Sequence, residues 1–343
     1  VEPAPGVLTL RELASRYVDY LQQRATTGKP KPITPRTLHD YVKIVRAFGK
    51  AVGGDTPAAK VGPPEFAAFA RSIGHLAPSA FGAIVGKVRA WWNWAVDAEL
   101  IDRVRFGPDF RVPPAAELRD SRIARRRRFT PAEVARLYES ADATIKPMIG
   151  LGICGALNNS EVGWLERECV DLASGVLDFR RRKRGKVRRV VPLPPDVVAA
   201  LAAYARPDPI DPAHAGLFFV SPAGHPYNRQ RDTADGGHTD KVGLDFARHM
   251  RRAGLKVAGA GDGRSFAGLR TTFANLAPGG YREEVEIITG HARGTVLLDH
   301  YLEDVGLARL VHVVDHVWGQ VSQWFSREWH GPVPVPARSR WPG

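Results

Sequence analysis

The sequence predicts a mainly α-helical, α+β protein of two domains that also contains a small antiparallel β-sheet or hairpin. Three observations lead to this fold class. The chain has 343 residues, which is more than one compact hydrophobic core usually contains. Apolar residues recur at three- and four-residue spacing over most of the chain, as in amphipathic helices. Segment 175–193 differs, because two β-branched runs flank a short basic turn that contains glycine.

Residues 7–104 are expected to form a small helical domain. Its first helix begins near Leu10, where the apolar stripe starts, and Thr34 followed by proline can cap the second helix. A proline pair at 63–64 opens a third helix, and residues 79–97 form a fourth with a strongly aromatic face. The result is a four-helix arrangement with no predicted strand.

Three tryptophans lie on the fourth helix, at positions 91, 92 and 94. Their helical spacing is typical of residues that fill a core, and large aromatic side chains contribute strongly to core packing. Stacking on nucleic-acid bases is the alternative. We favour core packing.

Residues 105–128 are interpreted as a linker between the domains. The segment loses helical periodicity, contains a proline pair and ends in a run of arginines. Such a linker can lie along a phosphate backbone, or it can be a solvated tether. We favour the first interpretation, and the predicted DNA contacts are Arg125, Arg126, Arg127 and Arg128.

The second domain is predicted over residues 129–328 and is followed by a proline-rich tail at 329–343. Thr130 can cap its first helix, which has proline at the next position and an acidic first turn. The other expected elements are a hairpin at 175–193, a short strand at 217–220, and helices at 240–253, 266–276, 283–289 and 306–326.

Charge and cysteine content limit the functional classes. Lys and Arg number 49 against 36 Asp and Glu, so the net charge is +13, which favours a nucleic-acid partner. The only cysteines, Cys154 and Cys169, exclude a disulfide framework and a four-cysteine zinc site. No apolar run is long enough for a membrane span. We expect a cytoplasmic, nucleoid-associated protein.

Three motifs occur in order along the second domain. Glu161-Val-Gly-Trp-Leu comes first and leads into the basic hairpin that contains Lys183. Leu-Arg270-Thr-Thr-Phe follows, and Thr-Gly-His291 comes last, with Tyr301 ten residues later. Phosphoryl transfer needs a nucleophile, cationic donors for the phosphate oxygens and an acid for the leaving group. These residue types can supply all three.

In these motifs the second domain resembles the catalytic domain of the tyrosine recombinases, the phage-integrase family, and the first domain resembles their core-binding domain. The resemblance implies a site-specific recombinase that cuts and rejoins double-stranded DNA through a 3′-phosphotyrosyl intermediate, without metal or cofactor. It implies Tyr301 as nucleophile, Lys183 as general acid toward the leaving 5′-oxygen, Arg270 as a phosphate clamp and His291 as the late-motif histidine. It also implies a bacterial mobile element as the source.

Two positions depart from the family pattern. Asn158 lies three residues before Glu161, where the family usually has its first arginine, and Ala267 lies where the family has a histidine before the second arginine. Loss of an arginine guanidinium that contacts the phosphate in the transition state can lower the rate of phosphoryl transfer by a factor of about 10³ to 10⁵. Arg264 or Arg293 could take the vacant place. Alternatively, the chain resembles a bacterial subgroup in which asparagine is natural here. Glu161 is expected to give structural support.

The hairpin from Lys183 to its closing leucine is one residue longer than the commonest family spacing, so Lys186 is the reserve candidate for the general acid. Most of its basic side chains are expected to bind phosphates rather than take part in chemistry. The DNA-binding residues predicted outside the linker are Arg181, Arg182, Arg184, Lys186, Arg188, Arg264 and Arg293.

Two other functions stay open: a DNA-binding relative with impaired or no cleavage, and a nicking and closing enzyme of the type IB topoisomerase kind. The resemblance implies a homotetramer on DNA, assembled through the C-terminal helix. That helix, at 307–325, carries a broad apolar stripe, which could dock on a neighbouring protomer or pack on its own domain.

Overall fold

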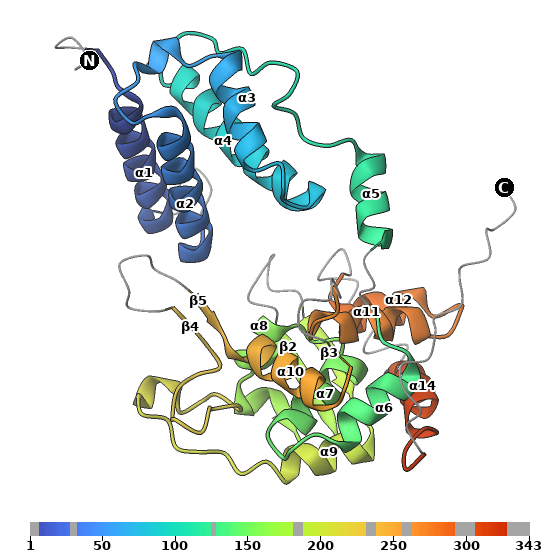
Figure 1. Cartoon of the computed structure of the whole chain (residues 1–343). Helices are drawn as coiled ribbons and strands as arrows, with labels where there is room; N and C mark the ends of the chain where they lie inside the picture. The colour runs from blue at the N-terminus through green and yellow to red at the C-terminus, as the bar shows by residue number, and fades with distance from the viewer. Residues whose placement is uncertain are drawn as a thin grey trace, which may run out of the picture. The chain divides into compact units, whose positions relative to one another are not determined.

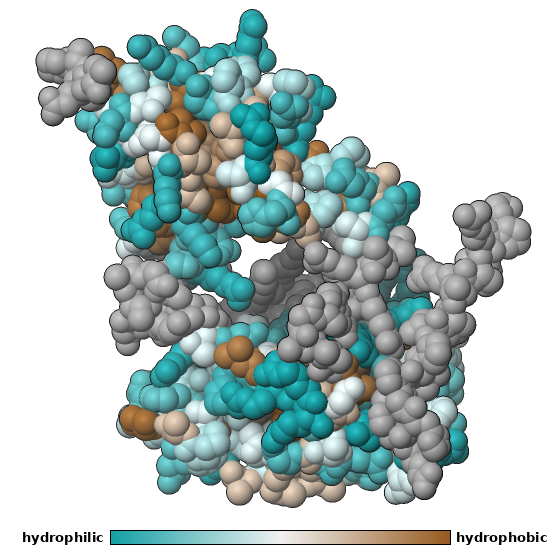
Figure 2. All heavy atoms as spheres, viewed as in Figure 1, coloured by the Kyte–Doolittle hydropathy of each residue, from teal (hydrophilic) through white to brown (hydrophobic). Residues whose placement is uncertain are grey.

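The computed structural model describes residues 7–27, 33–124, 128–180, 188–230, 238–255, 263–291 and 306–327 (Figure 1). The chain divides into two compact units, and the boundary between Arg125 and Arg126 falls inside the predicted linker. The mainly helical fold class with small antiparallel sheets is confirmed. In the view of Figure 2, hydrophilic side chains cover much of the described surface.

The first unit packs helices around an aromatic core. Thr34 caps the second helix by accepting the backbone N–H of Thr37, as the sequence predicts. Trp91 and Trp92 are fully buried, which confirms core packing, and Trp94 is half-buried against Tyr20. The helices are α1 (Leu10–Thr27), α2 (Pro35–Val52), α3 (Pro63–Ser72), α4 (Pro78–Asp97) and α5 (Ala115–Ala124), with the 3₁₀ helix η1 (Ala58–Lys60).

The segment predicted as a linker has more structure than expected. Phe110 is fully buried in the core of the first unit, with its ring 5.2 Å from that of Phe66. Residues 115–124 form α5, which begins directly after the proline pair. This helix has a weakly amphipathic sequence in which charged residues dominate, so hydrophobic periodicity gave no signal for it.

The second unit is built around α7, whose residues are nearly all buried. A methyl group on Gly150 would come 2.8 Å from Val197, and one on Gly152 would come 2.7 Å from Leu269. These two glycines therefore let α9 and α11 pack tightly on α7. The helices are α6 (Pro131–Glu139), α7 (Ile145–Cys154), α8 (Asn159–Gly163), α9 (Pro195–Ala202), α10 (Lys241–Arg252), α11 (Ala267–Leu276), α12 (Arg282–Thr289) and α14 (Gly306–Ser322).

A three-stranded antiparallel sheet in the order β1-β2-β3 contains the predicted hairpin. Its strands are β1 (Val170–Asp171), β2 (Val176–Arg180) and β3 (Arg188–Pro192), and the hairpin turn lies outside the described residues. A second pair, β4 (Asn228–Gln230) and β5 (His238–Asp240), was not predicted. The predicted strand at 217–220 is wrong: only isolated bridges occur there, from Leu217 to Glu166 and from Val220 to Pro226.

The apolar stripe of the C-terminal helix lies inside the second unit. Leu310, Val313, Val317 and Val321 of α14 are buried in the same core as α6, α7 and β3. The apolar stripe of α14 therefore packs on its own domain, which was one of the two interpretations left open. Among the described helices, none combines the length and apolar character needed to cross a membrane.

Candidate active site

Asn158 forms the N-cap of α8. Its side-chain oxygen accepts hydrogen bonds from the backbone N–H of Ser160 at 2.9 Å and of Glu161 at 3.0 Å. The Glu161 carboxylate in turn accepts the Asn158 N–H at 2.8 Å, which completes a capping box. An asparagine three residues before a glutamate is the sequence signal for this role. Asn158 therefore supports the local fold and brings no charge to the position where the resemblance implies an arginine.

Arg270 projects from α11 toward the loop before α8. Its Nη1 donates to the carbonyl of Ala156 at 2.9 Å, and its Nη2 donates to the carbonyl of Thr289 at the end of α12. The side chain is 16% exposed and lies 4.0 Å from the Glu161 carboxylate. Ala156 has a φ of +49°, a region sparsely populated by residues with a Cβ, and such strain often accompanies functional sites. Arg270 is thus fixed by main-chain acceptors while part of it reaches solvent.

His291 follows Gly290, which ends α12 in the left-handed conformation with a φ of +64°. Its Nε2 lies 3.1 Å from Nη2 of Arg270, and its Nδ1 lies 2.9 Å from the hydroxyl of Thr289. That hydroxyl donates to the carbonyl of Val285 at 2.6 Å. Because Arg270 can only donate, Nε2 must accept, and we assign the proton to Nδ1. The hydrogen bonds that run from Arg270 through His291 and Thr289 to the carbonyl of Val285 therefore favour the neutral tautomer of His291 with its proton on Nδ1.

Arg189 is the site residue that the sequence analysis missed. In the sequence it is one of several basic residues of segment 175–193 and carries no signal of its own, but it is fully buried on β3. Its Nη1 lies 3.0 Å from the Glu161 carboxylate, and its Nη2 donates to the carbonyls of Gly155 and Ile288. Alternation along the strand could have revealed this, because Arg189 is two residues from the buried Val191 and so faces the same side.

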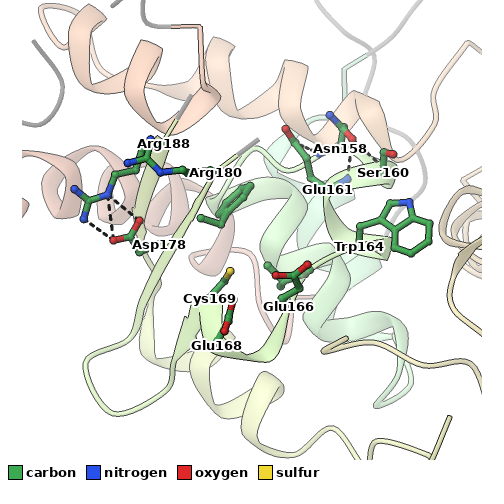
Figure 3. Close-up of a pocket in the computed structure, with 12 residues that line it drawn as sticks. Asn158, Ser160, Glu161, Trp164, Glu166, Glu168, Cys169, Asp178, Arg180 and Arg188 are labelled. Atoms are coloured by element: carbon green, nitrogen blue, oxygen red, sulfur yellow. Dashed lines mark hydrogen bonds and ion pairs between the residues drawn. The ribbon is translucent and has the colours of Figure 1, made fainter. Parts of the chain in front are cut away.

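A hollow of about 560 Å³ lies beside this cluster (Figure 3). Asn158 and Glu161 lie at one side of it, and Arg180 and Arg188 of the hairpin strands lie at the other. Arg188 binds the Asp178 carboxylate through two nitrogens, at 3.0 Å and 2.6 Å. The positive charge of this predicted DNA contact is therefore already paired within the sheet.

Glu166, Glu168 and Cys169 line the same hollow, and their ligand atoms lie within 4.8 Å of one another. This is the grouping in the described residues that comes nearest to a metal site. Burial raises the pKa of the Cys169 thiol, and the neighbouring carboxylates raise it further. Glu168 is exposed, and exposed acidic groups commonly lie together without a metal, so this set by itself does not indicate a metal site.

Arg264 is 5% exposed, and its Nη1 lies 2.8 Å from the buried carboxylate of Glu133. Its Nη2 donates to the carbonyl of Leu255 at 2.6 Å. These contacts and its burial argue against both the predicted phosphate contact and a move into the place beside Asn158. Arg128 donates to the side-chain oxygen of Asn275 on α11 at 3.2 Å.

The structure thus brings together four of the predicted site residues: Asn158, Glu161, Arg270 and His291. They come from the start of α8, from α11 and from the end of α12, three segments that are far apart in the sequence. Arg128, Arg188 and Arg264 are described above, and the other predicted residues lie outside the described ranges: Tyr301, Lys183, Lys186, Arg125, Arg126, Arg127, Arg181, Arg182, Arg184 and Arg293.

No protein-family model matches the chain, and neither does any curated protein sequence. Solved structures of integrases are similar to it in fold. A lambda integrase in a tetramer bound to a Holliday junction matches with a TM-score of 0.57 and 16% identity, over 90% of this chain and 77% of that one. The Tn1549 transposon integrase in complex with circular intermediate DNA matches with a TM-score of 0.58 and 16% identity, over 86% and 95%. The chain therefore has an integrase fold.

Proposed function

We propose that the chain is a site-specific DNA recombinase of the tyrosine recombinase family, which cuts and rejoins DNA strands through a 3′-phosphotyrosyl intermediate on Tyr301. The observation that carries the proposal is the cluster of Arg270, His291, Glu161 and Asn158, assembled from three separate segments on an integrase fold. The order of motifs along the sequence supports the same conclusion. The solved integrases with this fold were bound to DNA.

The roles follow from the charge requirements of phosphoryl transfer. We assign Arg270 as the donor to the equatorial phosphate oxygens, and this is supported by a guanidinium that backbone carbonyls hold and that is partly open to solvent. His291 lies next to it, and we assign it a role in proton transfer, for which its Nε2 would exchange the contact with Arg270 for one with the reacting groups. We assign Lys183 as the acid for the 5′-oxygen and Tyr301 as the nucleophile. Cationic side chains would then do the work that metal ions do in other phosphoryl transferases, with no cofactor.

Asn158 gives weight to a second candidate, a DNA-binding relative with impaired cleavage. Its oxygen is engaged in the cap of α8, so only its amide nitrogen, a neutral donor, can donate hydrogen bonds to a phosphate. A neutral amide donor stabilises the negatively charged transition state less than an arginine guanidinium, which forms two charge-assisted hydrogen bonds. The proposed enzyme is therefore expected to be slow unless a residue outside the described ranges supplies the missing charge.

We propose double-stranded DNA as the partner and a homotetramer as the working assembly. The net charge of +13 favours a polyanion, and the arginine run 125–128 and the hairpin residues 181–187 are the proposed phosphate contacts. Arg188 would have to give up its pairing with Asp178 to join them. Because the main stripe of α14 is buried in its own unit, assembly would have to use other surfaces. We place the protein in the cytoplasm on DNA, as the recombinase of a bacterial mobile element.

The test is a nicked suicide substrate that carries the attachment sequence next to the gene. The proposal expects a covalent protein–DNA adduct that resists denaturation and is lost in Tyr301→Phe. Binding of the same DNA is measured in parallel. Specific binding without an adduct would favour the second candidate, whereas neither binding nor an adduct on any site would contradict both.

A further inference from the structure

Arg189 and Arg270 both donate hydrogen bonds to the same two backbone segments, and in each segment they bind consecutive carbonyls. Arg189 donates to the carbonyls of Gly155 and Ile288. Arg270 donates to the next carbonyl in each segment, that of Ala156 and that of Thr289. The two guanidinium groups therefore lie in successive layers between the loop before α8 and the end of α12. The inner one is fully buried, and the outer one is partly exposed.

Both arginines also lie beside one carboxylate. Glu161 is 3.0 Å from Nη1 of Arg189 but 4.0 Å from Nη1 of Arg270. The same carboxylate oxygen accepts the backbone N–H of Asn158 at 2.8 Å. The inner arginine thus holds the nearer position beside Glu161, and the outer arginine stands beyond direct hydrogen-bond distance of that carboxylate.

We propose that Arg189 is a positioning residue that neutralises Glu161, so that the positive charge of Arg270 is presented to the phosphate. This inference rests on the proposed function. Among the described residues of the cluster, two arginines and one glutamate leave a net charge of +1. Without Arg189 the net charge would be zero, and Arg270 would be drawn toward Glu161. With a neutral residue at 158, this inner charge matters more, because the described cluster holds no third cation.

A purely mechanical brace would behave differently from a charge that offsets Glu161. Arg189→Met removes both the brace and the charge. Arg189→Met combined with Glu161→Gln also removes the brace but restores the net charge of +1. The double variant therefore separates the two roles, and removing both members of a buried ion pair is tolerated better than removing one. Arg309→Met is a matched control, since Arg309 pairs with the buried carboxylate of Glu284 in the same unit.

The readout is the binding of inorganic phosphate to the full chain, followed by the ¹⁵N–¹H signal of the Arg270 side chain, which Arg270→Lys identifies. We expect Arg189→Met to weaken phosphate binding by about tenfold or more, and the double variant to lie within about threefold of the wild type. Arg309→Met should change the affinity by less than about twofold. Equal losses in the single and double variants, or no loss in the single variant, would overturn the proposal.

Glu161→Gln keeps the inference testable if Arg189→Met does not fold. It leaves both arginines charged, so phosphate should bind about threefold tighter than in the wild type, and the double variant should return toward the wild type. Equal affinities of Glu161→Gln and the double variant would contradict the charge role. A wild type that binds no phosphate at Arg270 would contradict it as well.

This titration does not depend on cleavage, so the two proposals can fail separately. A covalent adduct on the suicide substrate reports the proposed function alone. An adduct with the wrong order of phosphate affinities would refute the role of Arg189 only. The expected order of affinities without an adduct would refute the proposed function and leave the role of Arg189 standing.

Discussion

Asn158→Arg should speed up strand cleavage while lowering stability, because position 158 caps α8 in the structure and, in the proposed function, is the place of a missing arginine. The present side chain accepts two backbone hydrogen bonds at the start of α8, at 2.9 Å and 3.0 Å. Arginine cannot accept them, and losing such a cap costs about 1 kcal/mol, within a range of about 0.5–2. For a domain of this size, that corresponds to a fall in Tm of about 2–4 °C.

The expected gain is larger than this cost. A charged arginine at the phosphate is worth about 10³ to 10⁵ in rate in comparable phosphoryl transfer, or about 4–7 kcal/mol of transition-state stabilisation. The Glu161 carboxylate, which already caps the Asn158 N–H, would lie close enough to steady the new guanidinium. The adduct rate on the suicide substrate at saturating DNA should therefore rise steeply even though the protein melts earlier.

Asn158→Ala is the matched control, because it removes the cap without adding charge. It should lose the same stability and gain no rate, as measured by thermal melting and by the adduct rate. If Asn158→Arg cleaves no faster than the wild type, the missing charge does not limit the reaction, and the reasoning fails. If neither variant is destabilised, the capping role is wrong.

Three further predictions concern single groups. Thr289→Val should reduce the Nδ1–H tautomer of His291 by about fivefold, the equivalent of one hydrogen bond of about 1 kcal/mol; an unchanged ¹⁵N shift pattern of the ring would contradict the assigned tautomer. Burial lowers the pKa of His249, so the unfolded state binds more protons, and resistance to urea should fall as pH drops below about 6.5; His249→Gln should flatten this dependence. Arg264→Met should cost about 3–5 kcal/mol in urea unfolding by stranding the Glu133 carboxylate, and adding Glu133→Gln should recover most of it; a double variant as unstable as the single would refute the ion pair's importance.

Elements with strong local signals were predictable from the sequence. Thr34 and Thr130 each cap the helix that the sequence assigned to them, because cap chemistry depends on neighbouring residues only. The two strands of the 175–193 hairpin were also predictable, because β-branched runs on either side of a glycine-containing turn are a local signal. The β4–β5 pair was not, since its strands are three residues long and carry no alternating apolar pattern.

The site was predictable in its residue types but not in its electrostatics. Motif order was enough to select Arg270 and His291, which the fold brings to within 3.1 Å of each other. Whether a basic side chain faces solvent or a buried carboxylate depends on tertiary contacts. Arg264 was therefore predicted as a DNA contact and Arg189 was not singled out from the basic hairpin, although both lie in buried ion pairs.

The position of Arg270 relies on main-chain acceptors more than on the residue at 158. Ala156 and Thr289 bind its guanidinium through their carbonyls, and backbone carbonyls persist whatever side chain follows. Asn158 contributes to this arrangement through its cap and its N–H, both of which act within α8 and its start. An asparagine there therefore removes charge from the site without dismantling its geometry. For this reason, a single substitution at 158 is a meaningful test of whether charge alone limits cleavage.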